Sequence, residues 1–416
     1  MMKRTAQNRF KALTSACVLS TMATVAWSQT LTWLGTLGGG RSEAYGVSAD
    51  GAVVVGWSYN AAGQGRAFRW TASGGMQDLG TLGGLGSWAN GVSADGSVVV
   101  GWAQNAAGRQ RAFRWTASGG MQDLGTLGGD ISVAWGVSAN GSVVVGWAQS
   151  AAGRERAFRW QNGVMQNLGT LGGDISMAWG VSANGSVVVG GIFYYDPFLD
   201  YYYARAFRWT VDGGMQDLGT LGRGGSWANG VSADGSVVVG WANNAAGFYR
   251  AFRWTASGGM QDLGTLGGGR SGAYGVSADG SVVVGAAETP PWGFYHAFRW
   301  TASGGMEDLN LTYASLLTNG SVLIEARAIS PDGRYIVGIG RNAATNRTEA
   351  FLLDTRCTAH NGDVNNDGCI DDADLLAVLF AFGNTGRNLG RVDVNCDGVV
   401  DDADLLQVLF NFGNGC

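Results

Sequence analysis

The sequence predicts an all-β fold, a seven-bladed β-propeller of four-stranded blades, followed by a small α-helical module. Two observations support the propeller prediction. First, each unit contains four short apolar runs separated by turn residues, which is the pattern of a propeller blade. Second, the units recur at intervals of 44 to 50 residues, the spacing of stacked supersecondary units. The block LGTLGG or a near copy begins at Leu34, Leu79, Leu124, Leu168, Leu218 and Leu263.

The second unit shows the four predicted strands most clearly. They are Trp88–Ala94, Ser97–Ala103, Arg111–Ala117 and Met121–Gly125. Asp95-Gly96 predicts a two-residue hairpin turn, because both residue types tolerate the positive φ that such turns need. The run of three valines after this turn is apolar on both faces, as expected of a strand between two neighbouring sheets.

The two ends of the array predict how the ring closes. A strand like the fourth strand of each unit appears at Leu31–Gly35, before any complete unit. The degenerate last unit, with Ala328, Tyr335 and Phe351, lacks such a strand. We therefore expect the N-terminal strand to complete the last blade, which also protects a sheet edge. The alternative is an open β-solenoid, whose period is usually shorter.

Composition and charge divide the chain into three parts. Residues 1–28 combine a basic start, an apolar run and small residues before Gln29, the layout of a secretory signal peptide, although Cys17 leaves a lipid anchor as an alternative. Residues 29–356 form the nearly neutral array, and residues 357–416 carry 2 Arg against 10 Asp. We expect a secreted, extracellular or cell-surface protein without a membrane span, and the charge balance argues against nucleic-acid binding.

The array resembles the HAF family of extracellular repeats, through its motifs GMxDLGTLGG, GVSADGSVVVG and AFRW and the sequence His296-Ala297-Phe298. The resemblance covers about residues 31–354. It implies a secreted or surface protein of the β-propeller type and implies no established catalytic activity.

The tag RAFRW predicts packing between blades rather than a binding site. A motif copied into every blade most often joins neighbouring blades, with Arg stacked on an aromatic ring or paired with Asp. No catalytic residues are assigned. The adjacent acids Glu307 and Asp308 point to opposite faces of a strand, so they do not make a pair of glycosidase acids.

Aromatic residues gather in the variable loops between the second and third strands, which share one rim of a propeller. Exposed aromatic clusters on loops usually mark a contact surface. A carbohydrate or an apolar protein would fit such a surface, and the alternative is that the rings fold back over their own blades. The candidates are Tyr194, Tyr195, Tyr201, Tyr202, Tyr203, Phe248, Tyr249, Trp292, Phe294 and Tyr295.

Two Asp-rich loops, 30 residues apart, predict two calcium sites in the tail. Oxygen donors stand at positions 1, 3, 5, 9 and 12 of each loop, Gly stands at position 6, and position 7 offers its backbone carbonyl, as in an EF-hand loop. The predicted metal ligands are Asp363, Asn365, Asp367, Cys369, Asp371 and Asp374 in the first loop, and Asp393, Asn395, Asp397, Val399, Asp401 and Asp404 in the second. Each loop is expected to continue into a short helix, Leu375–Phe382 or Leu405–Phe412, ended by a glycine.

A duplicated loop with one helix and Asp at position 12 resembles a type I dockerin, over about residues 361–415. The resemblance implies two Ca²⁺ ions and a cohesin partner in a multi-protein assembly. Positions 10 and 11 of the loops, Asp372-Ala373 and Asp402-Ala403, depart from the small hydroxyl residues of familiar members. The helices are apolar around most of their circumference, which predicts a surface for a cohesin-like partner, another surface protein or the propeller itself.

The tail holds four cysteines, an even number that predicts disulfides in an exported protein. Four cysteines allow three connectivities, of which we favour Cys369–Cys396 with Cys357–Cys416. Taken together, the sequence predicts a secreted, non-catalytic repeat protein for binding, adhesion or surface assembly. The alternative is an extracellular polysaccharide hydrolase carried on the propeller.

Overall fold

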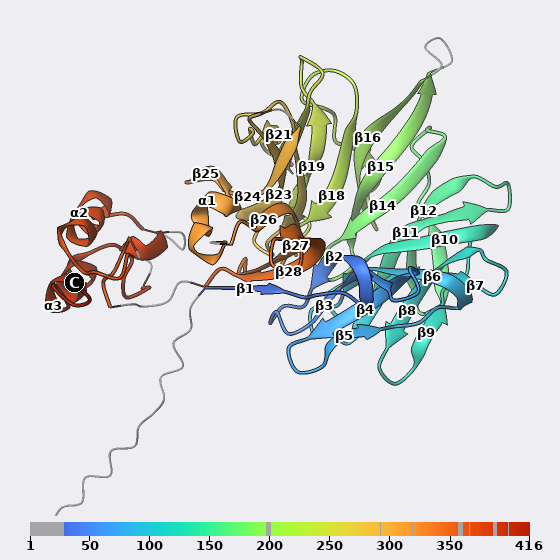
Figure 1. Ribbon diagram of the computed structural model, residues 1–416. Helices are drawn as coiled ribbons and strands as arrows, with labels where there is room; N and C mark the ends of the chain where they lie inside the picture. The colour runs from blue at the N-terminus through green and yellow to red at the C-terminus, as the bar shows by residue number, and fades with distance from the viewer. Residues whose placement is uncertain are drawn as a thin grey trace, which may run out of the picture.

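The computed structural model describes residues 29–196, 201–291, 293–317, 319–356, 361–365, 367–385, 389–397 and 399–416. The predicted signal peptide, Trp292 and Cys357 lie outside these residues. The array is built of antiparallel sheets arranged around a centre, and a pair of helices follows it (Figure 1). No helix in the described part of the chain is both long and apolar enough to cross a membrane.

The sheets repeat one order of strands: an inner strand, two middle strands and a short outer strand. The inner strands are β2 (Gly38–Val47), β6 (Gly83–Val92), β10 (Gly128–Val137), β14 (Ile175–Val181), β18 (Ser226–Val231), β22 (Ser271–Val276) and β26 (Val322–Ile329). The second strands are β3 (Val54–Asn60), β7 (Val98–Asn105), β11 (Val143–Ser150), β15 (Val187–Asp196), β19 (Val237–Asn243), β23 (Val282–Thr289) and β27 (Tyr335–Asn342). The third strands are β4 (Gly65–Thr71), β8 (Gln110–Thr116), β12 (Glu155–Gln161), β16 (Tyr201–Thr210), β20 (Tyr249–Thr255), β24 (Phe294–Thr301) and β28 (Arg347–Asp354). The outer strands are β5 (Gly75–Asp78), β9 (Gly120–Asp123), β13 (Val164–Asn167), β17 (Gly214–Asp217), β21 (Gly259–Asp262), β25 (Gly305–Asp308) and β1 (Thr30–Trp33). The short helices α1 (Leu309–Thr312) and η1 (Ala314–Leu316) connect β25 to β26, and α2 (Asp372–Ala381), η2 (Gly390–Val392) and α3 (Asp402–Phe410) belong to the tail.

The N-terminal strand closes the ring, as predicted. β1 pairs antiparallel with β28, in a register that places Leu31 opposite Leu353 (Figure 1). Five sheets have four strands each, and the remaining sheet has eight. The eight-stranded sheet consists of two antiparallel halves, the first unit and the last, which are linked by one parallel pair, Arg41 with Thr348.

The hydrophobic cores lie between successive units rather than inside them. In the core between the first two units, Val53, Val55 and Ala67 of the first pack against Phe113 and Trp115 of the second. The phenylalanine of every AFRW or AFLL tag has no exposed surface. The core that joins the ends combines Val54 and Phe68 with Val337 and Ala350, so the ring closes through the same kind of contact.

A buried serine in six of the seven inner strands ties neighbouring units together, and the exception is β26. Ser132 accepts a hydrogen bond from the backbone N–H of Ala112, at 2.9 Å, and donates one to the carbonyl of Gly125, at 2.6 Å. Ser42 repeats this across the seam, since it accepts from the N–H of Ala350, 308 residues away. Equivalent bonds are made by Ser87, Ser176, Ser226 and Ser271.

Both arginines of the repeated tag are used in packing, as predicted. The first pairs with the Asp of the adjacent outer strand, for example Arg111 with Asp123 at 3.0 Å. The second donates to a turn carbonyl of the next unit, for example from Nε of Arg159 to Gly185 at 2.9 Å. The motif therefore serves the contacts between strands and between units.

The first hairpin of each unit differs from its prediction. The Asp95-Gly96 loop is longer than two residues, because the last backbone pair is Ser93 with Val98, and only Gly96 has a positive φ, of 72°. The carboxylate of Asp95 accepts from the hydroxyl of Ser93 at 2.6 Å and from the N–H of Ser97 at 3.0 Å. These hydrogen bonds, with that of Ser93 the largest cause, lower the pKa of Asp95 to about 2. Asp234 is held in the same way, with its pKa also lowered to about 2.

Backbone hydrogen bonds also join these turns around the axis. The N–H of Ala49 donates to the carbonyl of Ala94, and the same bond repeats from unit to unit as far as the bond from Ala278 to Pro331. Proline has no N–H, so Pro331 cannot donate to the next carbonyl in the circle, that of Ala49.

We predict that Ser132→Ala lowers the free energy of unfolding by about 1–3 kcal/mol, because it leaves a buried N–H and a partly buried carbonyl without partners. Urea denaturation measures this loss. Ser118→Ala, in the exposed loop between β8 and β9, is the control and should change stability by less than about 0.5 kcal/mol. An equal effect of the two changes would contradict the bridging role.

We further predict that the double variant Asp95→Asn, Asp234→Asn loses less stability in acid than the native chain. The two carboxylates have folded pKa values of about 2, below the ordinary 3.8, so their stabilisation is present above pH 4 and is lost as the pH falls toward 2. Asparagine keeps the turn, as Asn140 does, but does not titrate. Melting temperatures between pH 7 and pH 2 provide the measurement, and Asp212→Asn, in the loop between β16 and β17, removes a charge from outside these turns as the control.

Candidate functional site

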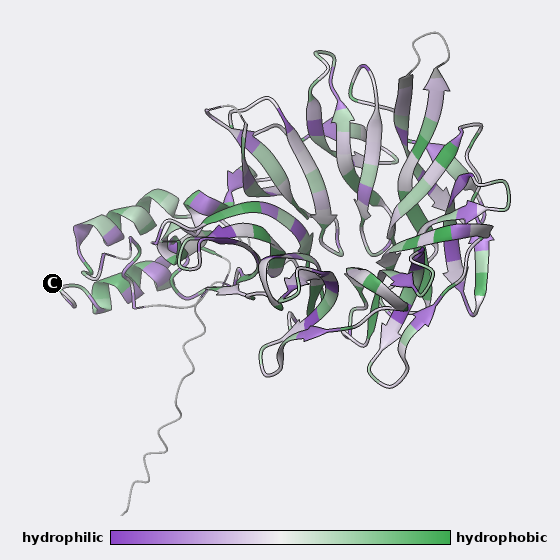
Figure 2. Cartoon of the chain, turned by 45° about the vertical axis from the view of Figure 1, so that its right-hand side comes forward, coloured by the Kyte–Doolittle hydropathy of each residue, from purple (hydrophilic) through white to green (hydrophobic). Residues whose placement is uncertain are grey.

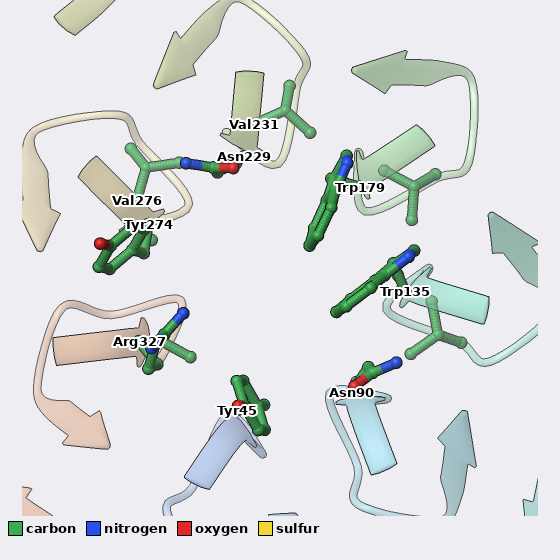
Figure 3. A pocket seen from close by; sticks show the side chains of 18 of the residues that line it. Tyr45, Asn90, Trp135, Trp179, Asn229, Val231, Tyr274, Val276 and Arg327 are labelled. Carbon is green, nitrogen blue, oxygen red and sulfur yellow. The ribbon is translucent and has the colours of Figure 1, made fainter. Parts of the chain in front are cut away.

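A cavity of about 390 Å³ lies at the centre of the ring, where the inner strands converge (Figure 3). Three consecutive residues from each of the seven inner strands line it. The first of the three differs between units, and the other two are Gly and Val in all but the last. The first residues are Tyr45, Asn90, Trp135, Trp179, Asn229, Tyr274 and Arg327, which we call the variable ring.

A β-bulge places each member of the variable ring. In the first unit Ala44 pairs with Gly56 and Gly46 with Val55, so that Tyr45 is the extra residue of the inner strand. The same shift occurs at the corresponding position of all seven inner strands. A bulge turns its side chain away from the ordinary alternation, and here the side chains point toward the cavity (Figure 3).

The glycine that ends each VVVG run makes room for the bulge. A Cβ atom at Gly101 would collide with the carbonyl oxygen of Trp88, and one at Gly146 with that of Val133. Every unit shows this clash between the glycine and the carbonyl two residues before its variable-ring member. The repeated glycine and the variable residue are thus parts of one local structure.

One side of the variable ring is aromatic and amide in character. The rings of Trp135 and Trp179 stack with their centroids 3.9 Å apart and their planes inclined by 28°. The side-chain N–H groups of Asn90 and Asn229 donate to the carbonyls of Ala134 and Ala273, both at 2.8 Å, so each amide bridges to the next unit.

The opposite side centres on Arg327. Its guanidinium lies 5.4 Å from the ring centroid of Tyr45 and 4.9 Å from that of Tyr274, and it forms an ion pair with Glu325. Burial, the largest single cause, would lower the pKa of Arg327, but Glu325 together with Tyr274, Tyr45 and Glu43 outweighs burial and raises the pKa. Burial, with a smaller contribution from Glu325, raises the pKa of Tyr274 to about 12. Arg327 is therefore charged, and the Tyr274 hydroxyl is neutral, at physiological pH.

The hydroxyl of Tyr45 is also held neutral. Burial raises its pKa, and so does the negative charge of Glu43, whose carboxylate accepts the Tyr45 hydrogen bond at 2.6 Å. Glu43 is also paired with Arg41, at 2.6 Å.

Sequence reasoning missed the variable ring, although a signal was present. The residue before the GVSADG block, or before its degenerate copy, varies from unit to unit. The residue one position earlier is always Ala, as in EAYGV, WANGV and VAWGV. Strict strand alternation does not predict where that side chain points, because the bulge breaks the alternation.

The predicted rim aromatics lie partly on the extended hairpin of β15 and β16 (Figure 1). Tyr194 stacks on Tyr203 with centroids 5.4 Å apart, and Tyr195 contacts Tyr202 at 5.0 Å. These are cross-strand pairs. Tyr195 and Tyr202 are exposed, as are Phe248, Tyr249 and Phe294, whereas Tyr194, Tyr203 and Tyr295 are half-buried. The backbone of Tyr201 lies in β16, but its side chain is outside the described structure, as is Trp292.

The two loop-and-helix halves of the tail clasp each other. After α2, the N–H of Gly383 donates to the carbonyl of Val400, and after α3 the N–H of Gly413 donates to that of Ile370, both at 2.8 Å. Both glycines have positive φ, as their predicted place after a helix requires. The helices begin three residues earlier than predicted, at Asp372 and Asp402, because Asp371 and Asp401 cap them. The core pairs equivalent residues of the halves: Val364 and Val394, Ile370 and Val400, and Val378 and Val408.

Positions 9 and 12 of each loop form a capping box. Asp371 accepts from the N–H of Ala373, and Asp374 accepts from the N–H groups of Val364, Asn365 and Asp371. Burial would raise the pKa of Asp374, but these backbone donors outweigh it and lower the pKa. Asp401 and Asp404 repeat the box.

One buried oxygen in the first tail loop bears on its fit to calcium. Among the residues that the structure describes, no three His, Cys, Asp or Glu side chains converge into a metal-binding group. However, Oδ1 of Asp363, at position 1 of the first loop, is buried and has no hydrogen-bond partner, while Oδ2 accepts from the N–H of Gly368. A buried carboxylate oxygen without a donor suits a cation, so the donor set fits Ca²⁺.

The predicted disulfide pairing is wrong. The structure joins Cys369 to Cys416, which rules out both the Cys369–Cys396 and the Cys357–Cys416 pairs. Cys396 is also disulfide-bonded. The reason is the clasp: Gly413 and Asn414 bond to Ile370, which brings the C-terminal Cys416 beside Cys369.

Among known proteins, similarity to this chain is found with solved structures. No family model matches the chain, and no curated protein matches it. Solved structures similar to it include the β-propeller domain of the Trilobed protease from Pyrococcus furiosus, at 10% identity, with 78% of this chain and 95% of that chain covered and a TM-score of 0.49. A putative TolB from Agrobacterium tumefaciens is similar at 14% identity, with 64% of this chain and 88% of that chain covered and a TM-score of 0.41. A puromycin-hydrolyzing peptidase of Mycobacterium tuberculosis is similar at 14% identity, with 79% of this chain and 51% of that chain covered and a TM-score of 0.49.

Proposed function

We propose that the chain is a secreted, non-catalytic binding protein. In this proposal a seven-bladed propeller of the HAF type carries the recognition surface, and a dockerin-like tail, loaded with two Ca²⁺ ions, attaches the protein to a partner. The count of seven blades takes each half of the eight-stranded sheet as one blade, in addition to the five four-stranded sheets.

The observation that carries the proposal is a duplicated apolar surface on the tail. Phe380 is 87% exposed on α2, and Phe410, 30 residues later, is 83% exposed on α3. Both tail helices show hydrophobic colouring along their length (Figure 2). Exposed apolar groups in this number mark a protein interaction site. The set consists of Leu376, Leu379, Phe380, Phe382, Leu406, Leu409, Phe410 and Phe412.

Calcium would organise this surface. The residues that would hold the ions are the oxygen donors of the two loops, and Asp363 has the buried oxygen that such an ion would satisfy. Bound calcium supplies positive charge that offsets repulsion among the aspartates. Since each loop leads directly into one helix, the loops support the positions of the apolar side chains.

The lining of the central cavity favours binding over the alternative of a polysaccharide hydrolase. Its side chains are aromatic, amide, guanidinium and aliphatic, groups that position a ligand. The similar structures include both TolB and peptidases, and neither activity is transferred to this chain.

We predict that the full chain binds two Ca²⁺ ions, measured by isothermal titration calorimetry after chelator treatment. Asp363→Ala and Asp393→Ala should each remove one site, because each deletes the position 1 carboxylate of one loop. Asp372→Ala removes the same charge from an exposed position that is not a predicted ligand, and should keep both sites. Two sites in the Asp363→Ala variant, or none in the native chain, would show that the loops are not calcium sites.

We predict that the native chain binds immobilised type I cohesin modules in calcium and dissociates in EDTA. The double variant Phe380→Ala, Phe410→Ala should lose this binding, because it removes the two most exposed rings of the tail. Val211→Ala, which alters an exposed apolar residue of the propeller, should not. Failure of the native chain to bind any cohesin tested would reject a cohesin as the partner.

A further inference from the structure

The variable ring is the layer of the cavity lining in which the units differ most. Its members stand between an alanine that all seven units share and a glycine that six of them share. Seven positions use four residue types: two Tyr, two Trp, two Asn and one Arg. All four types can form hydrogen bonds, and four of the seven side chains are aromatic. If this layer only filled space at the axis, one repeated apolar residue would be enough. The next layer, which consists of Val and Ile, is of that kind.

Four buried polar atoms in this ring lack a hydrogen-bond partner: Nε1 of Trp135, Nε1 of Trp179, Nε of Arg327 and Oδ1 of Asn90, of which the Asn90 oxygen is the acceptor. The Asn90 side chain is 7% exposed, and its Oδ1 has no hydrogen-bond partner. Its N–H group is already used by Ala134, which fixes the orientation of the amide. The oxygen lies at the end of the amide on the side of Tyr45, opposite the nitrogen, which lies on the side of Trp135 (Figure 3). A buried acceptor without a donor costs about 1–3 kcal/mol, and a ligand hydroxyl entering the cavity would recover this.

Apolar surface faces the same space. Trp135, next to Asn90 around the ring, and Trp179 direct the six-membered parts of their indoles toward the middle (Figure 3). Their stacking on each other, at 3.9 Å, fixes both rings. Rigid aromatic surface beside an oriented amide suits a ligand with one apolar face and hydroxyl groups at its edge.

The charges around the cavity balance. Arg327 is paired with Glu325, and Glu43 is paired with Arg41. An anion would have to compete with Glu325 for the guanidinium. A cation would find the faces of Tyr45 and Tyr274 already engaged by Arg327. The balance favours an uncharged ligand.

We propose that the central cavity binds a neutral saccharide, whose apolar face lies on Trp135 and Trp179 and whose hydroxyl donates to Oδ1 of Asn90. The inference deepens the proposed binding function, because it assigns the propeller a site and a ligand class. It also moves recognition from the rim aromatics to the axis. The volume of about 390 Å³ lies within the usual range of small-molecule sites, about 300–1,000 Å³.

The test uses the full chain and saturation-transfer NMR with glucose, galactose, mannose, xylose, N-acetylglucosamine and cellobiose. At least one sugar should bind and quench tryptophan fluorescence. Asn90→Ala should weaken binding about tenfold or more, as expected for a lost hydrogen bond in a buried site. Trp179→Ala should abolish binding, and Trp179→Phe, which keeps an aromatic face and is the safer change for folding, should retain part of it.

Matched controls separate the cavity from the rim. Tyr202→Ala and Tyr249→Ala remove exposed rim rings and should leave sugar binding unchanged. Loss of binding in these variants, with normal binding in Asn90→Ala and Trp179→Phe, would overturn the cavity site in favour of the rim. Binding of tetramethylammonium or glucuronate in place of the neutral sugars, or of none of the sugars, would overturn the ligand class. Calcium and cohesin titrations of the same samples report on the tail separately, so the two proposals can fail independently.

Discussion

Every core in the array is made by two neighbouring units, and this constraint determines the rest of the propeller. A single unit leaves one apolar face of its sheet uncovered, so it gains burial only by stacking on another. The first and last units have the same need, and their cores meet through Phe68 and Val337. The N-terminal β1 completes the final sheet by pairing with β28. Closure therefore buries the apolar faces of the end units and also pairs the edge of the last sheet.

Closure gives most repeated residues a fixed structural role. The serines of six inner strands, the arginines of the RAFRW tags and the glycine of each VVVG run all serve contacts within or between units. Residues with these roles cannot vary without cost to every interface. Variation is left to the rim loops and to the bulge residues at the axis, whose contacts differ between units apart from the bridge that Asn90 and Asn229 share. Recognition by a repeat protein is expected where its copies differ, and here two such zones lie toward opposite ends of the sheets.

The sequence predicted the all-β array, the closing strand and the packing role of the arginines, because these follow from periodicity and from residues that act locally. It did not predict the bulge. The extra residue at Tyr45 depends on a carbonyl that approaches Gly56 across the sheet, a tertiary effect that alternation does not reveal. The predicted two-residue turn was wrong because the carboxylate of Asp95 accepts hydrogen bonds from Ser93 and Ser97, which form a longer loop. Disulfide connectivity depended on the clasp between the tail halves, which spacing cannot show.

The circle of backbone bonds at the turns contains a single gap. It runs from Ala49 through five further alanines to Pro331, where the missing N–H leaves the link back to Ala49 unmade. The gap falls at the junction of the first and last units, which is held on its outer side by β1 and near its middle by Ser42. As at the six other junctions, an outer strand continues here into the next inner strand, β1 into β2, so this junction differs in lacking the backbone bond between turns at the axis. The break in the array lies instead inside the last sheet, where β1 and β28 are joined by strand pairing rather than by a loop. A force that draws Thr30 and Asp354 apart would therefore unzip β1 from β28, one residue pair after another, and open the ring within that sheet.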